Sequence, residues 1–374
     1  MAYLRYTQKA KLYGAPTKGF PLLFTDDGKV HWLSLNYFLE LTRSNAVSSI
    51  KTYARHLQDL FSQLEAEEEV VELDFIDDDY LLAYKSALID RDGDINSDNY
   101  ASQIIRTVLH YCKWLEDNRY VRNLIGNTTN HKIRIDISGD GNIKHPLSKN
   151  RSKDKRASIA PRAGWIDIVK KYGPASSHVN ARFELMIDWG RTVGLRALEA
   201  CYLSISQLPS RETVEKAIET GVNVHILLTV TKGSRDKNIP INPLLLKKTW
   251  DYIDITRVEV VKKFKQRAKD KHSQYKEPTY IFLSEKTGFA LSPVSFSNSV
   301  RQAFLAAIDS GELTEDERVW CHGLRHNFVV TLFKALDDKK VPRTEAVARQ
   351  VSRHGSNDAM EPYLTDRFNE SFHE

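Results

Sequence analysis

Cysteine is scarce in this sequence of 374 residues, and its three cysteines stand far apart. Cys112, Cys201 and Cys321 form no Cys-x-x-Cys pair, which argues against a disulfide framework and against a structural zinc site. Nowhere do about eighteen apolar residues stand together, the length that a membrane-spanning helix needs. The N-terminal residues also lack the apolar run of a signal peptide. We therefore expect a cytoplasmic protein with no membrane partner.

Net charge is low as well, at +5, so the overall charge says little about a nucleic-acid partner. The distribution of charge says more, because the stretch 144–156 is strongly basic, and 257–276 is a second basic stretch. Either stretch could be a solvated face or a linker, but basic stretches that flank candidate chemistry favour contacts with phosphate groups. The DNA-binding candidates are Lys144, Lys149, Arg151, Lys153, Lys155 and Arg156.

Apolar residues at helical spacing indicate a mainly α-helical protein of more than one domain. Residues 36–122 read as a compact helical domain, preceded by a segment 1–35 with a hairpin signal at Asp27 and Gly28. The stretch 123–160 has no clear periodicity, so we expect it to be a basic interdomain linker. Residues 161–374 form a second domain, again rich in helices, with one small antiparallel sheet. Its strands are expected at 224–230 and 238–241.

The stretch "HGLRH" concentrates unusual chemistry in one helical turn. His322, Arg325 and His326 are spaced i, i+3 and i+4, so they share one face of a helix. Two histidines at this spacing can bind zinc, but Gly323 stands where a zinc helix carries its general-base glutamate. Arg325 would also place a fixed positive charge beside a metal ion. These residues argue against a metal site. On the motif alone, two interpretations stay open, a clamp for a phosphate group and a purely structural role in which the histidines are hydrogen-bonded at a domain edge.

Four further features lie on either side of this motif, and their order along the chain is characteristic. Arg196 stands at the start of a helix with Glu199 in the same turn, Lys232 lies in a hairpin turn, and His354 precedes Tyr363 by nine residues. Together with "HGLRH", this order resembles the catalytic domain of the tyrosine recombinases, the phage-integrase family. The resemblance covers most of the chain. It implies a helical SAM-like core-binding domain over 36–122, followed by an α+β catalytic domain.

The resemblance also implies a role for each residue. Arg196 and Arg325 would stabilise the charge of a five-coordinate phosphate, His322 and His354 would share its oxygens and move protons, and Lys232 would protonate the departing 5′-oxygen. Tyr363 would be the nucleophile and would form a 3′-phosphotyrosine. Such a reaction needs no metal ion, ATP or other cofactor, and the chain has no Gly-x-x-x-x-Gly-Lys loop. Glu199 and His326 would support the site without reacting.

The chain departs from the family pattern in two places. Arg353 precedes His354 where the family often has glycine, so either the local turn differs or the arginine contacts DNA. The interval from Arg196 to Lys232 is long, with "PSRETVEKAIETG" inserted before the sheet. Lys237 is therefore a rival for the catalytic lysine.

The expected function is site-specific integration or excision of a mobile element. Double-stranded DNA and a synaptic tetramer of this chain are the partners, accessory DNA-bending proteins are further candidates, and the location is the cytoplasm with its nucleoid. A chromosome or plasmid dimer resolvase and a type IB topoisomerase-like enzyme are alternatives that share the chemistry. A DNA-binding regulator without activity is a third alternative, disfavoured because every catalytic residue type is present.

Overall fold

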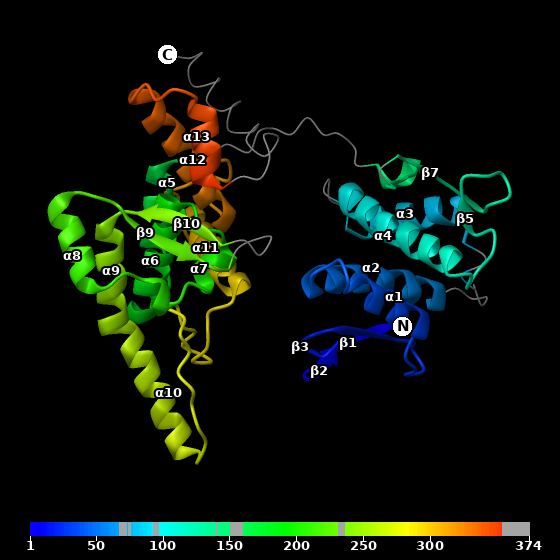
Figure 1. Cartoon of the computed structure of the whole chain (residues 1–374), viewed down its shortest axis with the longest axis horizontal. Coiled ribbons are helices and arrows are strands. Elements are labelled where there is room, and N and C mark those ends of the chain that lie inside the picture. Colours follow the sequence, from blue (N-terminus) through cyan, green and yellow to red (C-terminus); the bar gives the residue numbers. More distant parts are fainter. Residues whose placement is uncertain are drawn as a thin grey trace. The chain divides into compact units, whose positions relative to one another are not determined.

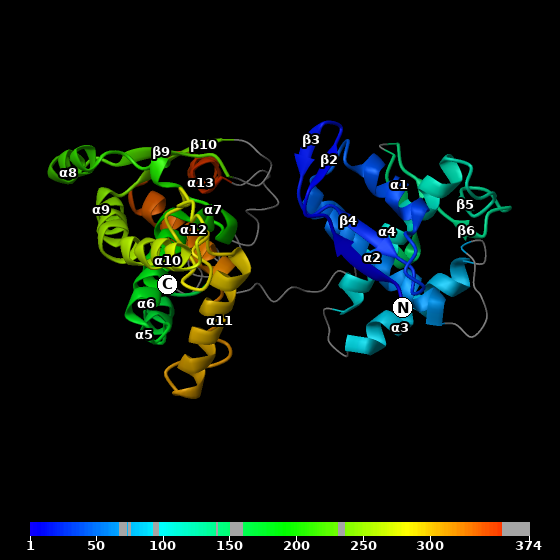
Figure 2. The same cartoon turned by 90° about the horizontal axis from the view of Figure 1, so that it is seen from below.

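The chain folds into two compact units, Met1–Asp154 and Lys155–Glu374, each with its own hydrophobic core (Figures 1 and 2). The structure is a computed structural model, and it describes residues 1–66, 73, 76–92, 97–139, 141–149, 160–230 and 236–353. Among these residues, no helix combines the length and the apolar character needed to cross a bilayer.

Four helices form the body of the first unit. They are α1 (Trp32–Leu41), α2 (Val47–Ala66), α3 (Asp78–Asp92) and α4 (Ser97–Asp117). Helix α4 shows why this sequence is helical: its apolar residues recur every three or four positions and make one buried stripe. Ile105, Val108, Leu109, Cys112 and Leu115 are all completely buried, as their spacing predicts. The helical architecture expected for this part of the chain is confirmed.

The N-terminal segment is built differently from the expected hairpin. Strand β1 (Tyr3–Tyr6) pairs antiparallel with β4 (Pro21–Phe24), and β2 (Ala10–Leu12) pairs with β3 (Ala15–Thr17). A turn is present at Gly28, but the residues on its two sides are joined by a single isolated β-bridge, Phe24 to Val30, and form no pair of strands. The segment also contributes Ala2, Phe20 and Leu23 to the core of the first unit, so it is part of that unit.

The expectation of a linker beginning at residue 123 is wrong for its described part. Leu124, Ile125, Ile133 and Ile135 are buried in the core of the first unit. Short elements follow one another here, and they are β5 (Ile125–Gly126), β6 (Ile133–Arg134), β7 (Asp136–Ile137), β8 (Ile143–Lys144) and η2 (Pro146–Ser148). Backbone carbonyls of this stretch are bonded by helix side chains: Arg106 Nη2 donates to Ser148 O at 2.8 Å. Residues 123–149 therefore belong to the first unit.

The second unit is mostly helical around one two-stranded sheet. Its helices are α5 (Ala163–Lys171), α6 (Ser177–Val193), α7 (Ala197–Cys201), η3 (Ile205–Gln207), α8 (Arg211–Thr220), α9 (Pro243–Tyr252), η4 (Ile253–Arg257), α10 (Val258–Asp270), α11 (Pro293–Asp309), α12 (Cys321–Asp338) and α13 (Thr344–Ser352). Strands β9 (Val224–Leu228) and β10 (Lys237–Ile241) pair antiparallel, which confirms the predicted sheet. Helix α8 accounts for "PSRETVEKAIETG", the stretch that is inserted before the sheet relative to the family pattern.

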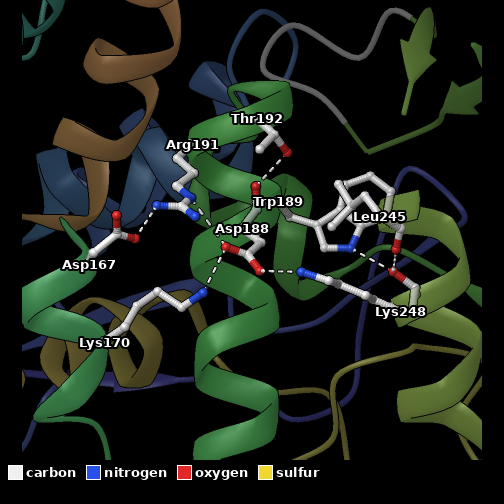
Figure 3. A network of polar contacts seen from close by, with 9 residues as sticks. Asp167, Lys170, Asp188, Trp189, Arg191, Thr192, Leu245 and Lys248 are labelled. Carbon is white, nitrogen blue, oxygen red and sulfur yellow. Dashed lines mark hydrogen bonds and ion pairs between the residues drawn. The ribbon is translucent and has the colours of Figure 1, made fainter. Parts of the chain in front are cut away.

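Helix α6 is the centre of the second unit, and a polar network fixes it to its neighbours (Figure 3). The Asp188 carboxylate accepts from Lys170 on α5 at 2.9 Å, and it also lies 3.2 Å from Arg191 and 3.8 Å from Lys248 on α9. In the next residue of α6, the buried Trp189, Nε1 donates to Thr249 Oγ1 on α9 at 3.0 Å. Because α6 is held on two sides, the turn that follows it has a fixed position.

Candidate functional site

The "HGLRH" motif forms the first turns of helix α12. His322 is exposed, whereas Leu324 and Arg325 are completely buried. Helix α12 approaches α6 closely at Gly190, where a Cβ atom would stand 2.9 Å from Leu324 Cδ1. The start of α12 therefore lies against the end of α6, with the buried Leu324 at the point of contact.

Arg325 joins two segments that are distant in sequence. Its Nη1 donates to Gly194 O at 2.6 Å, and its Nη2 donates to Ser352 O at the end of α13. Gly194 ends α6 in the left-handed conformation (φ 66°), the turn that the sequence predicts at 192–195. A fully buried guanidinium therefore ties the α6–α7 turn to the C-terminus of α13.

Arg196 stands at the N-cap of α7, directly after this turn. Its Nη1 donates to Glu199 Oε1 at 2.9 Å, and its backbone N–H donates to Glu199 Oε2 at 3.0 Å. Glu199 is buried, but 28% of the Arg196 side chain remains exposed. Glu199 therefore orients one edge of the guanidinium and leaves other N–H groups available to an outside acceptor.

Arg353 completes the cluster. It follows α13 in the left-handed conformation (φ 63°), and its side chain is only 5% exposed. Its Nη2 lies 3.3 Å from Glu199 Oε2 and donates to Gly194 O at 2.7 Å. The expectation that the turn departs from a glycine geometry is wrong, since the backbone keeps the φ that favours glycine. The side chain turns inward to a carboxylate, and the alternative of a DNA contact for Arg353 stays a prediction.

The two histidines of α12 lie edge to face, with ring centroids 5.0 Å apart. His326 also contacts Trp320, with the ring centroids 5.7 Å apart. Burial, with smaller contributions from His322 and Arg325, lowers the pKa of His326 to about 4. A neutral, half-buried imidazole is consistent with the supporting role predicted for His326. Within the part of the chain that the structure describes, no three His, Cys, Asp or Glu side chains are grouped as a metal site.

Arg196, Glu199 and Arg325 thus meet in one hydrogen-bonded cluster, and His322 is one turn from Arg325 on the same helix. Lys232, His354 and Tyr363 lie outside the described residues, and so do Arg151, Lys153, Lys155 and Arg156. Lys144 and Lys149 are exposed on the first unit, and Lys237 is exposed on β10 opposite Leu228.

Two members of the cluster were not predicted as site residues. The turn at Gly194 was predicted, but not that its carbonyl accepts from two arginines. Arg353 carried a signal, since it occupies a position where glycine is common in the family. That signal does not identify Glu199 as the partner, because the contact joins residues far apart in sequence.

No protein-family model matches this chain. No curated protein matches it either. Solved structures do match.

A lambda integrase dimer bound to a COC′ core site has a TM-score of 0.57 and 15% identity, covering 90% of this chain and 95% of that chain. The XerH site-specific recombinase in a pre-cleavage complex with its difH substrate has a TM-score of 0.55 and 16% identity, covering 90% and 82%. The Tn1549 transposon integrase in complex with circular intermediate DNA has a TM-score of 0.50 and 14% identity, covering 88% and 94%. Since these likenesses span both units, the protein has the fold of the tyrosine recombinases, a helical core-binding domain followed by an α+β catalytic domain.

Proposed function

We propose that this protein is a site-specific tyrosine recombinase that cuts and rejoins double-stranded DNA through a 3′-phosphotyrosyl intermediate. The observation that carries the proposal is a cluster of three arginines, in which Arg196 and Arg353 share the carboxylate of Glu199. Arg325 joins the cluster at the Gly194 carbonyl, to which Arg353 also donates. A cluster of three guanidinium groups that contains one carboxylate has an excess of positive charge, which suits an anionic ligand. Chains with the same fold have been solved with DNA substrates.

Arg196 is the member of this cluster that suits direct contact with the scissile phosphate. It is held on one edge by Glu199 and is partly exposed, so its remaining N–H groups could receive two phosphate oxygens without reorganising. Arg325 would act from its buried position, because it bonds the Gly194 turn and the end of α13. His354 follows α13 closely in the sequence.

The remaining roles are assigned from the sequence. His322, exposed at the start of α12, and His354 would share the phosphate oxygens, and one of them would accept the phenol proton from Tyr363. Tyr363 attacks the phosphorus, the P–O bond to the 5′-carbon breaks, and Lys232 protonates the departing 5′-oxygen. The reverse attack by a 5′-hydroxyl restores the DNA and frees the tyrosine. The strand is therefore rejoined without ATP, and the reaction needs no metal ion. Lys237 remains the rival for the lysine role.

The decisive experiment is the covalent protein–DNA adduct. Tyr363→Phe should abolish an adduct that survives denaturation, and DNA affinity should stay nearly unchanged because only one hydroxyl group is lost. Tyr120→Phe, at an exposed tyrosine of the first unit, is the matched control and should form the adduct normally. An adduct that persists in Tyr363→Phe would show that another residue is the nucleophile. Adduct formation should also continue in EDTA.

Integration or excision of a mobile element is the biological role that we propose. It requires two DNA sites, a tetramer of this chain and exchange of strands between the sites. A circular plasmid with two copies of the target in the same orientation should yield two smaller circles, whereas a plasmid with one copy should be relaxed at most. Relaxation with equal efficiency from either plasmid, and no smaller circles, would instead favour a topoisomerase-like enzyme.

A further inference from the structure

Arg353 occupies an unfavourable position for an arginine. Its φ of 63° lies in the left-handed region, which disfavours residues with a Cβ atom. The side chain is almost fully buried, and burial lowers the pKa of the guanidinium, with Arg196 acting in the same direction and Glu199 in the opposite one. A strained backbone that carries a buried charge persists only where the surroundings hold it, and such positions are common at functional sites.

The contacts of Arg353 show what holds it there. Only Nη2 has acceptors among the described residues, Glu199 Oε2 at 3.3 Å and Gly194 O at 2.7 Å. Its Nε and Nη1 are buried and have no hydrogen-bond partner among those residues. The ion pair with Glu199 and the bond to Gly194 are therefore the polar interactions that direct this side chain inward.

Glu199 is shared between two arginines, and this sharing has an electrostatic consequence. Oε1 accepts from the side chain of Arg196, and Oε2 accepts from its backbone and contacts Arg353. With Arg196 as its only partner, the buried carboxylate would offset most of the positive charge of Arg196. A second guanidinium on the other oxygen balances the carboxylate, so that Arg196 keeps its charge for an outside anion.

We propose that Arg353 is a positioning residue that shares Glu199 with Arg196 and thereby maintains the orientation and the positive charge that Arg196 offers to the scissile phosphate. This inference rests on the proposed function of the same site. It goes beyond that function by assigning Arg353 an action through Glu199, without contact with DNA.

The test compares two glycine substitutions at the two ends of one helix. Arg353→Gly removes the buried side chain at a backbone position that glycine accepts. Arg343→Gly is the matched control, because Arg343 also has a positive φ (55°), immediately before α13, but its side chain is exposed. DNA affinity and the rate constant of single-turnover cleavage are measured for the full-length chain, on a nicked substrate that releases the cut fragment.

We expect Arg353→Gly to lower the cleavage rate constant by about tenfold to a hundredfold, the range that a misplaced catalytic group causes. Its DNA affinity should stay within about threefold, since the proposed defect lies in the reacting state and not in ground-state binding. Arg343→Gly should cleave like the unaltered protein. Arg353→Lys keeps a positive charge beside Glu199 and should recover part of the lost rate, which a purely structural role would not predict.

A second comparison isolates the route through Glu199. In a Glu199→Gln background, the carboxylate that Arg353 balances is gone, so adding Arg353→Gly should reduce the rate by much less than it does in the unaltered protein. Equal reductions in both backgrounds would overturn the inference, as would normal cleavage by Arg353→Gly. Absence of any covalent adduct with the unaltered protein would overturn the proposed function as well, so the two failures are distinguishable.

Discussion

Arg196 and Arg325 carry the same functional group in opposite surroundings. Arg325 is completely buried and bonds two backbone carbonyls, whereas Arg196 is partly exposed and bonds one carboxylate. A buried acceptor that loses its donor is costly, while a partly exposed ion pair contributes little to stability. The two arginines should therefore differ in what they do for the fold, even if both are needed for cleavage.

Alanine substitution should separate these two contributions. Arg325→Ala should lower the free energy of unfolding of the second unit by about 2–4 kcal/mol, because Ser352 O loses its charged donor and a cavity remains. Arg196→Ala should cost less, about 1–2 kcal/mol, because the buried Glu199 loses one donor but keeps the backbone N–H of residue 196 and Arg353, yet it should abolish the covalent adduct. Urea denaturation and the adduct assay measure both quantities. Equal losses of stability in the two variants would contradict this division of roles.

His326 should make the second unit sensitive to acid. Its pKa in the folded protein is about 4, below the ordinary value of 6.5, so between these values the unfolded chain binds more protons. The stability that neutral His326 provides is fully present above about pH 6.5 and is lost as the pH falls toward about 4. Melting temperatures measured from pH 7.5 to 4.5 should therefore fall more steeply for the unaltered protein than for His326→Gln.

His178→Gln is a suitable control for this measurement, because His178 is an exposed histidine of the same unit. Its pH profile should follow that of the unaltered protein. If the His326→Gln profile also did so, the environment that burial creates around His326 would not govern acid sensitivity.

At the scale of elements, the sequence allowed good prediction where burial imposes a period. The stripe of α4, the turn at Gly194 and the paired strands β9 and β10 follow from apolar spacing and turn residues. The pairing of β1 with β4 and the very short strands of 123–149 could not be predicted in this way. Two-residue strands carry no period, and their partners are set by tertiary contacts.

The residues of the candidate site also differ in how far the sequence predicts them. Residues that belong to a local motif, such as Arg196 with Glu199 or His322 with Arg325, could be identified from the sequence. The contact from Arg353 to Glu199 could not, because it depends on how the end of α13 packs beside the start of α7. Sequence spacing gives no information about such packing.

The α6–α7 turn should tolerate no side chain at Gly194. A Cβ atom there would stand 2.4 Å from Phe328 Cδ1, and φ is positive. Gly194→Ala should therefore lower the free energy of unfolding by about 2–4 kcal/mol, from left-handed strain together with overpacking. Cleavage should fall too, because the Gly194 carbonyl positions Arg325 and Arg353.

Gly221→Ala supplies the control for this position. Gly221 ends α8 with a nearly equal φ of 67°, but a Cβ atom would meet no atom within 4 Å. Only the left-handed strain, about 1–2 kcal/mol, should then remain, and cleavage should be unchanged. If the two alanine variants lost equal stability, crowding by Phe328 would play no part.

At the scale of the whole molecule, local charge matters more than the net charge of +5. Lys144 and Lys149 are exposed at the end of the first unit, and four further basic residues follow them in the sequence up to residue 156. We expect this basic segment to follow the phosphate backbone of bound DNA. A cation that neutralises a phosphate releases a counterion, so each such contact steepens the dependence of DNA affinity on salt.

Substituting Lys144 and Lys149 with glutamine should therefore reduce the slope of log K against log salt concentration by up to about two, at about 0.9 per lost phosphate contact. The matched variant substitutes Lys216 and Lys247, exposed lysines of α8 and α9, and removes the same net charge. Its slope should stay unchanged if the basic segment contacts phosphates directly. Fluorescence anisotropy with labelled duplex DNA from about 50 to 200 mM salt covers the range in which such slopes are measurable. Identical slope changes in the two variants would mean that net charge, and not contact by the segment, sets the salt dependence.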